Sequence, residues 1–173
     1  MYYLTQGDQS AVWTNLGDLY VKLGQYYKAL EAYETANQRA HETETALRYA
    51  DLLIRLQRYA QAEELLKRAL GQEPRQGRAL VSLGRLYVAE RNYTQAENAL
   101  RQAVKLDPNN SDAHLFLGRA LEKLGRTEEA RQEIALASEK RETERESTRL
   151  LRGVLVPTME DAASPDGENR AHH

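Results

Sequence analysis

The chain of 173 residues contains no cysteine, one tryptophan, one phenylalanine and four prolines. Without cysteine there can be no disulfide, thiolate zinc site, iron–sulfur cluster or cysteine nucleophile, although the compartment is left open. No apolar run approaches the ~18 residues that a membrane span needs, and the N-terminus lacks the basic and apolar regions of a signal peptide. We therefore expect a cytoplasmic protein with no membrane insertion.

A strong charge of either sign is also lacking. The formal net charge is -2 and the pI is near 6.1, so nothing draws the whole chain to nucleic acid or to an anionic membrane. The run EKRETERESTR, residues 139–149, alternates acids and bases, which favours a solvated helix over a nucleic-acid site. With 41% hydrophobic residues, the chain should bury a core in one domain.

Motifs of catalysis and metal binding are absent from the sequence. There is no HExxH, Walker A, glycine-rich dinucleotide loop or serine-centred motif. The four histidines are His41, His114, His172 and His173, and we interpret His114 as a packing residue with a polar edge. We expect no enzyme, no cofactor and no metal site.

What the sequence does contain is an internal repeat. Ala62, Ala96 and Ala130 lie 34 residues apart. The same interval separates Ala69, Ala103 and Ala137, as well as the pairs Tyr59/Tyr93, Pro74/Pro108 and Gly84/Gly118. In the opening stretch the interval is one residue shorter, since Ala29 and Ala62 lie 33 residues apart. This period predicts four repeats, at residues 10–42, 43–76, 77–110 and 111–144.

Each repeat carries two apolar patterns of helical spacing. Apolar residues recur at i, i+3, i+4 and i+7, which predicts amphipathic helices. Glycine, asparagine or arginine interrupts each repeat near its middle, and the prolines mark the borders between repeats. We expect eight helices of about 12 to 15 residues, with Ser111 or Asp112 capping the seventh.

The repeats resemble tetratricopeptide repeats. The first matches the family pattern at Trp13, Leu16, Gly17, Tyr20, Tyr26, Ala29, Tyr33 and Ala36, and the third at Leu80, Leu83, Gly84, Tyr87, Tyr93, Ala96, Leu100, Ala103 and Pro108. The resemblance covers residues 10–144. It implies an all-α fold, an α-solenoid of stacked antiparallel helix pairs that form a right-handed superhelix. We expect Gly84 to face Ala96, so that the two helices of a repeat approach closely.

Both ends of the chain depart from the repeat. Residues 1–9 read as a remnant of a preceding repeat, with a turn at Gly7 and Asp8. Residues 146–156 can extend the last helix or start a short one, and Leu150, Leu151, Val154 and Leu155 predict that this C-terminal capping helix covers the fourth repeat. Residues 157–173 are rich in acidic and small residues, which predicts a disordered tail.

The resemblance also implies a binding surface. In the family, the first helix of each repeat lines a concave groove. The corresponding residues here are Thr14, Asp18, Val21, Lys22, Leu47, Asp51, Ile54, Arg55, Arg78, Val81, Arg85, Val88, Leu115 and Arg119, with Glu122 at the far end. Their apolar centre and graded charge predict a protein-binding groove for a helix or extended peptide of a partner protein.

Two further hypotheses concern partners. Family members that bind Hsp70 or Hsp90 tails grip the terminal carboxylate with Lys, Asn and Arg; this chain has Thr14, Asp18, Arg48, Arg78 and Ser82 there, so we expect no such binding. The alternative to a groove module is a structural or self-assembling segment of a larger protein, associating through the N-terminal face of the first repeat with Tyr2, Tyr3 and Leu4.

Overall fold

The computed structural model describes residues 6–40 and 42–155 of the chain. These residues form helices and turns, with no strand among them. The helices are α1 (Gln6–Lys22), α2 (Tyr26–Arg39), α3 (Thr43–Arg55), α4 (Tyr59–Gln72), α5 (Gly77–Ala89), α6 (Tyr93–Leu106), α7 (Ser111–Lys123) and α8 (Thr127–Leu155). Among the described helices, none has both the length and the apolar character to cross a membrane. The predicted cytoplasmic location stays a prediction.

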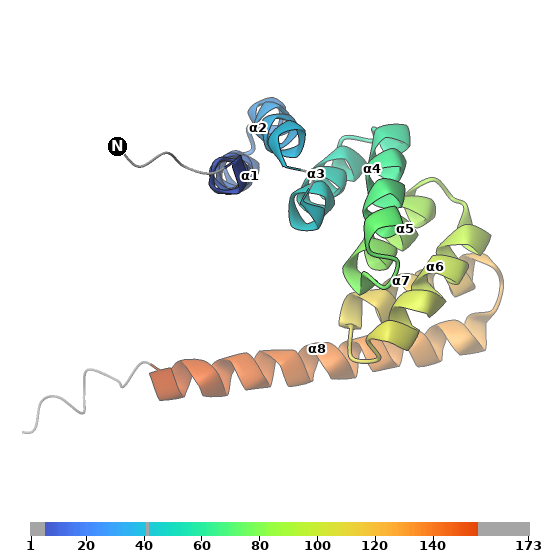
Figure 1. Cartoon of the computed structure of the whole chain (residues 1–173). Coiled ribbons are helices and arrows are strands. Elements are labelled where there is room, and N and C mark those ends of the chain that lie inside the picture. Colours follow the sequence, from blue (N-terminus) through green and yellow to red (C-terminus); the bar gives the residue numbers. More distant parts are fainter. Residues whose placement is uncertain (1–5, 41, 156–173) are drawn as a thin grey trace, which may run out of the picture.

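The helices stack in pairs along an arc (Figure 1). The first helix of each pair, α1, α3, α5 or α7, lies on the inner side of the arc, and α2, α4 and α6 lie on the outer side. Neighbouring helices in the chain contact each other, and so do α1 with α3, α3 with α5 and α5 with α7. The predicted all-α solenoid of stacked helix pairs is therefore confirmed.

The core runs between the two rows of helices. Small residues at the repeat interval are fully buried, as at Ala29, Ala62 and Ala96, which are each 0% exposed. Leucines and tyrosines from neighbouring helices fill the space around them. Since one helix pair cannot cover its own apolar surface, each repeat depends on its neighbour for burial.

The glycine contact agrees with the prediction only in part. The three atoms nearest to a Cβ built on Gly84 all belong to Leu100, with Cγ at 2.3 Å, whereas a Cβ on the equivalent Gly118 would lie 3.0 Å from the carbonyl oxygen of Ala130, the counterpart of Ala96. A Cβ atom on Gly17 would meet Tyr33 at 2.5 Å, and one on Gly118 would meet Ile134 at 2.6 Å. The glycine thus makes room for the large residue sixteen positions later in its repeat, one helical turn beyond the predicted alanine.

A left-handed residue closes the turn inside every repeat. Its φ angle is +71° at Gly24, +59° at Gln57, +63° at Arg91 and +79° at Gly125. These four residues hold the same position in the four repeats. The turn therefore imposes a backbone conformation that glycine adopts freely and that glutamine and arginine adopt at a cost.

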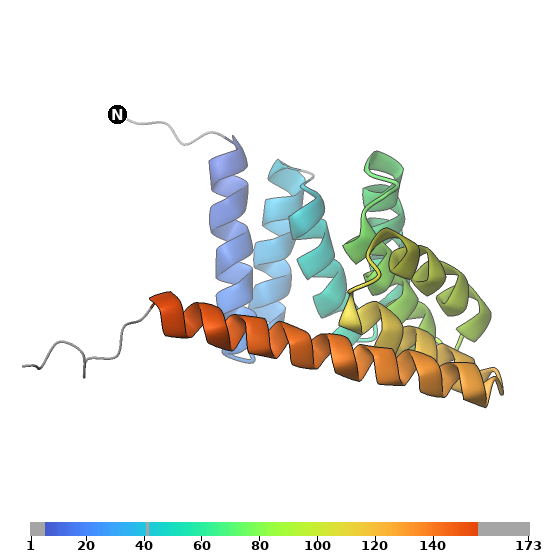
Figure 2. The same cartoon turned by 90° about the horizontal axis from the view of Figure 1, so that it is seen from below.

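The first and last helices correct two predictions. Gly7 and Asp8 lie inside α1 and form no turn, and residues 1–5 lie outside the described part. α8 is continuous through residue 144 and through Gly153, so the C-terminal residues extend the last helix, which was one of the two expected forms. Leu150 and Leu151 are 61% and 62% exposed and do not cover the fourth repeat, because α8 runs straight past it (Figures 1 and 2).

The predicted tail, residues 157–173, lies outside the described residues, as does His41 between α2 and α3. The cap of α7 also differs from the prediction. Asn110, rather than Ser111 or Asp112, accepts a hydrogen bond at Oδ1 from the backbone N–H of Ala113, at 2.9 Å. Asparagine is among the preferred N-cap residues because its side chain satisfies a free N–H of the first turn.

Candidate functional site: the inner groove of the solenoid

The inner surface of the arc contains two hollows that share one carboxylate, Asp51. The first, of about 230 Å³, is lined by Asp18, Val21, Tyr33, Arg48, Asp51, Leu52 and Arg55. The second, of about 240 Å³, is lined by Leu47, Asp51, Arg78, Val81, Ser82, Arg85, Asn110 and Asp112. Together they follow the first helices α1, α3, α5 and α7, and we call them the inner groove.

Acidic residues of the inner groove are bound by arginines of the next repeat. Arg48 of α3 bonds to Asp18 of α1, and Arg78 of α5 bonds to Glu44 of α3. Arg85 Nη1 lies 3.0 Å from Asp51 Oδ1. These pairs join one repeat to the next, and they neutralise the acidic residues that the sequence placed at one end of the groove.

Two further hydrogen bonds fix the same carboxylates. The hydroxyl of Tyr33 donates to Asp18 Oδ1 at 2.6 Å, and the hydroxyl of Ser82 donates to Asp51 Oδ1 at 3.3 Å. Burial raises the pKa of the Asp51 carboxyl above its ordinary value, although Arg85 and Ser82 oppose this shift. Burial acts in the same direction on Glu44, but the hydrogen bonds from Arg78 and Arg48 outweigh it and hold the pKa of Glu44 below its ordinary value.

Positive charge remains at two arginines near the inner groove, Arg55 and Arg119. Arg55 has no carboxylate partner among the described residues; its guanidinium lies over the Tyr26 ring, 5.3 Å from the centroid, and donates to the Tyr26 hydroxyl at 3.2 Å. Arg119 likewise has none there, and its guanidinium carbon lies 5.1 Å from the centre of the Phe116 ring. Arg85 flanks that ring too, at 5.4 Å. Aromatic rings hold the two cations in place without cancelling their charge.

The predicted groove residues fall into two groups. Those that line the two hollows are Asp18, Val21, Leu47, Asp51, Arg55, Arg78, Val81 and Arg85. Those that line neither are Thr14, Lys22, Ile54, Val88, Leu115, Arg119 and Glu122. Thr14 is 6% exposed, and its hydroxyl bonds to the Ser10 carbonyl at 2.9 Å and to the Thr45 hydroxyl at 2.8 Å, so this side chain serves the packing between repeats.

The residues that line the hollows but were missed by the sequence interpretation are Tyr33, Arg48, Leu52, Ser82, Asn110 and Asp112. Arg48 and Ser82 hold the sixth position of their repeats, and Asp112 holds the second. A signal existed at the second position, where Glu44 and Arg78 have opposite charges at the same place in successive repeats. The sixth position gave no such signal, because its residues share neither size nor charge.

His114 occupies the tryptophan position of the fourth repeat and is 4% exposed. Its Nδ1 lies 2.6 Å from Glu133 Oε2, and its Nε2 lies 3.0 Å from the Pro108 carbonyl oxygen. Both ring nitrogens are therefore held by groups of α8 and of the turn before α7. Among the described residues, no group of His, Cys, Asp or Glu side chains could hold a metal ion.

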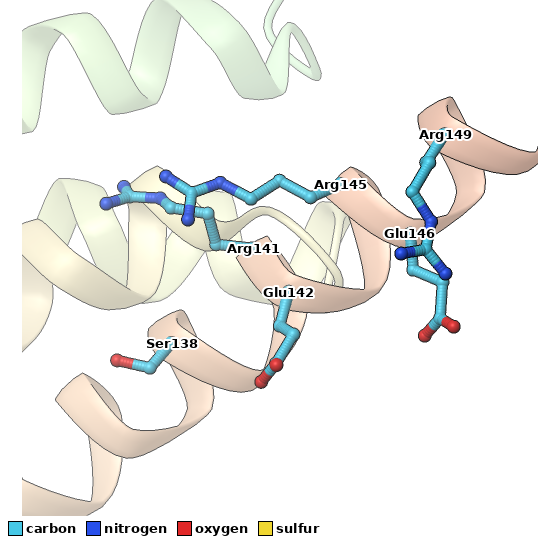
Figure 3. Close-up of a pocket in the computed structure, with 6 residues that line it drawn as sticks. All are labelled: Ser138, Arg141, Glu142, Arg145, Glu146 and Arg149. Carbon is cyan, nitrogen blue, oxygen red and sulfur yellow. The ribbon is translucent and has the colours of Figure 1, made fainter. Parts of the chain in front are cut away.

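A third hollow, of about 650 Å³, lies along the C-terminal half of α8. Ser138, Arg141, Glu142, Arg145, Glu146 and Arg149 line it. Arg141 and Arg145 extend to one side of the helix, and the carboxylates of Glu142 and Glu146 point away from them (Figure 3). This surface carries both signs of charge.

Comparison with known proteins agrees with this architecture. The protein-family model described as "Tetratricopeptide repeat" matches residues 81–143. A second family model, the fourth ARM domain of tetratricopeptide repeat protein 21, matches residues 12–82. Together these matches cover residues 12–143. The chain is an α-solenoid of helix pairs, and it belongs to the tetratricopeptide-repeat family.

Two curated relatives resemble a short part of the chain. Tetratricopeptide repeat protein 21B of Xenopus laevis is 39% identical over 59 residues, and tetratricopeptide repeat protein 21A of Mus musculus is 39% identical over 57 residues. These matches cover 34% and 33% of the chain and 4% of each relative. The chain thus corresponds to a small fraction of the length of these relatives.

Two solved structures share the fold. A crystal structure of MamA aligns with a TM-score of 0.68 and 21% identity, over 79% of this chain and 81% of that chain. The first repeat domain of Spaghetti (RPAP3), bound to the HSP90 peptide SRMEEVD, aligns with a TM-score of 0.65 and 22% identity, over 69% of this chain and 95% of that chain. At this level of identity, the likeness concerns the fold.

Proposed function

We propose that the chain is a non-catalytic interaction module whose inner groove binds an extended peptide or a helix of a partner protein. The observation that carries this proposal is the pair of adjoining hollows around Asp51, whose apolar side chains include Leu47 and Val81. A fold neighbour, the RPAP3 repeat domain, is a peptide-bound example of the same architecture. Recognition through a preformed groove needs little rearrangement of the protein.

The charges favour an acidic partner. Asp18, Glu44 and Asp51 are each bound by an arginine, so they offer little to a cationic ligand. Arg55 and Arg119 have no carboxylate partner among the described residues. A peptide with apolar side chains at its centre and acidic residues on both sides would complement this arrangement.

The groove differs from one that grips a terminal carboxylate. Thr14 is buried, and Asp18 would repel a carboxylate if Arg48 released it. Arg48 itself is shared between Asp18 and Glu44. These contacts favour recognition of an internal segment over recognition of a C-terminus.

A displayed library of random peptides, selected against the purified chain, tests the proposal. We expect the selected peptides to carry acidic residues beside apolar ones and to lose at least tenfold in affinity on Arg55→Glu, a change of ~1.4 kcal/mol at a residue that lines the first hollow. Arg75→Glu makes the same change of charge at an exposed turn outside the groove and serves as the control. Peptides that bind wild type and Arg55→Glu equally well would contradict the proposed site.

A further inference from the structure

A second candidate interface lies on the face of α1 that points away from the rest of the solenoid. Val12, Leu19 and Leu23 are 56%, 51% and 60% exposed. Together with Leu16 they follow the spacing i, i+4, i+7 and i+11. Leu23 comes directly after α1, and its N–H donates to the Leu19 carbonyl at 3.0 Å, so the four residues lie on one face. α1 is the outermost helix at its end of the solenoid (Figure 2). We call these four residues the α1 stripe.

Two positions of the stripe, those of Val12 and Leu19, are buried in the other repeats, whereas the position of Leu23 is exposed at Glu90 and at Leu124. The residues equivalent to Val12 are Thr45, Ala79 and Ala113, and those equivalent to Leu19 are Leu52, Leu86 and Ala120; none of the six is more than 2% exposed. In those repeats the second helix of the preceding pair contacts this face. The α1 stripe is thus a helix-packing surface with no preceding helix pair against it among the described residues.

The other end of the solenoid is not complementary to the α1 stripe. Leu70 and Val104 pack towards the next repeat, and their equivalent in α8 is the exposed Ser138. Arg141, Glu142 and further charged residues surround it. Stacking a second copy head to tail would bury these charges against leucine side chains, which is unfavourable.

We propose that the α1 stripe binds the α1 stripe of a second copy of the chain, with the two helices antiparallel about a twofold axis. The spacing of Val12, Leu16, Leu19 and Leu23 reads four, three, four in both directions. Leu16 then lies against Leu19 of the second copy, and Val12 against its Leu23, as an isologous interface requires.

The charges of α1 permit this pairing. Asp18 is turned into the inner groove, where it binds Tyr33 and Arg48. Within the span of the stripe, residues 12–23, the one other charged side chain is Lys22, and in the antiparallel pairing the two Lys22 positions lie ~13 Å apart along the helices. No like charges therefore meet across the proposed twofold axis. A single pair of helices lies near the lower limit of specific interfaces, roughly 1,000 Å², so the dimer dissociates on dilution.

Sedimentation of the full chain over a range of concentrations tests the pairing. We expect the mass to rise from one chain towards two, and Leu19→Glu to hold the chain at one with an unchanged helical circular dichroism spectrum. Leu151→Glu alters an equally exposed leucine on α8 and should leave the dimer intact. A single-chain mass at every concentration, or a dimer that Leu151→Glu abolishes, overturns the proposal.

Disulfide trapping tests the orientation, because the chain has no native cysteine. We expect Val12→Cys chains mixed with Leu23→Cys chains to form a cross-linked heterodimer under mild oxidation. Val12→Cys alone should stay uncross-linked, since two Val12 positions would lie about 16 Å apart along antiparallel helices, too far for a disulfide. Efficient cross-linking of Val12→Cys to itself overturns the antiparallel arrangement.

Discussion

The Arg85 guanidinium lies 3.0 Å from the Asp51 carboxylate, and both residues hold the ninth position of successive repeats. Because the two charges neutralise each other, this pair offers little to a charged partner. The pair also connects α3 to α5 where the two hollows of the inner groove meet. We interpret it as a contact that aligns neighbouring repeats, and its energetic weight can be measured.

A double-mutant cycle with Asp51→Asn and Arg85→Gln measures that weight. The two side chains are 42% and 30% exposed, so water screens the pair, and we expect a coupling of ~0.2 to 1 kcal/mol in urea unfolding. The coupling should shrink in high salt. A coupling well above this range would mean that the pair is a main source of stability.

Gly84→Ala should destabilise the chain. The added Cβ would lie 2.3 Å from Cγ of the fully buried Leu100, and we expect a net loss of ~1 to 2 kcal/mol after the gain in helix propensity. Gly71→Ala is the matched control, because nothing lies within 4 Å of its Cβ. Thermal unfolding of both variants provides the comparison, and equal melting temperatures would contradict the close contact.

Arg91→Gly should stabilise the chain. Arg91 is exposed with φ of +63°, and glycine removes the cost of this conformation, which we expect to exceed the added entropy of the unfolded chain by ~0.5 to 1 kcal/mol. Arg91→Ala separates the backbone effect from the loss of the side chain and should give no gain. Urea midpoints measure both, and a less stable glycine variant would refute the prediction.

The network around Glu97 predicts a loss of stability in acid. Burial raises the pKa of Glu97, but hydrogen bonds from Arg101 and Arg126 outweigh this and lower it below the ordinary 4.5. A lowered pKa stabilises the fold above 4.5, and this contribution disappears as the pH falls through the folded-state value. Glu97→Gln should therefore be less stable than wild type near neutral pH and should approach it in acid. A constant difference across the titration would contradict this origin.

The repeat period made the fold predictable from the sequence. Alanines at the repeat interval mark the buried side of each second helix, as at Ala62 and Ala96, and proline and glycine mark the turns. The nearest side chain to Gly84, Leu100, was not the predicted alanine, since the pattern gives the buried face of a helix but not its axial shift against the next helix. The exposure of Leu150 and Leu151 was also missed, because apolar residues in this position suggested a packed cap.

The candidate site was less predictable. Positions taken from the family pattern identified the first helices and most residues around Asp51. They could not show that Arg48 reaches Asp18, or that Arg119 and Arg85 flank Phe116, since such contacts depend on side-chain reach between repeats. The predicted gradient from acidic to basic residues therefore becomes a set of bound carboxylates with two arginines that have no carboxylate partner among the described residues.

Methyl-resolved NMR of the chain with a library-selected acidic peptide tests the central claim most directly. Binding in the inner groove should shift the methyl resonances of Leu47 and Val81, with smaller changes at Val88 and Leu115. The methyl groups of Leu65 and Ala99, on the outer row of helices, should stay unchanged. Shifts confined to the outer row or to Val12 and Leu19 of α1 would contradict the account of the inner groove as the recognition surface.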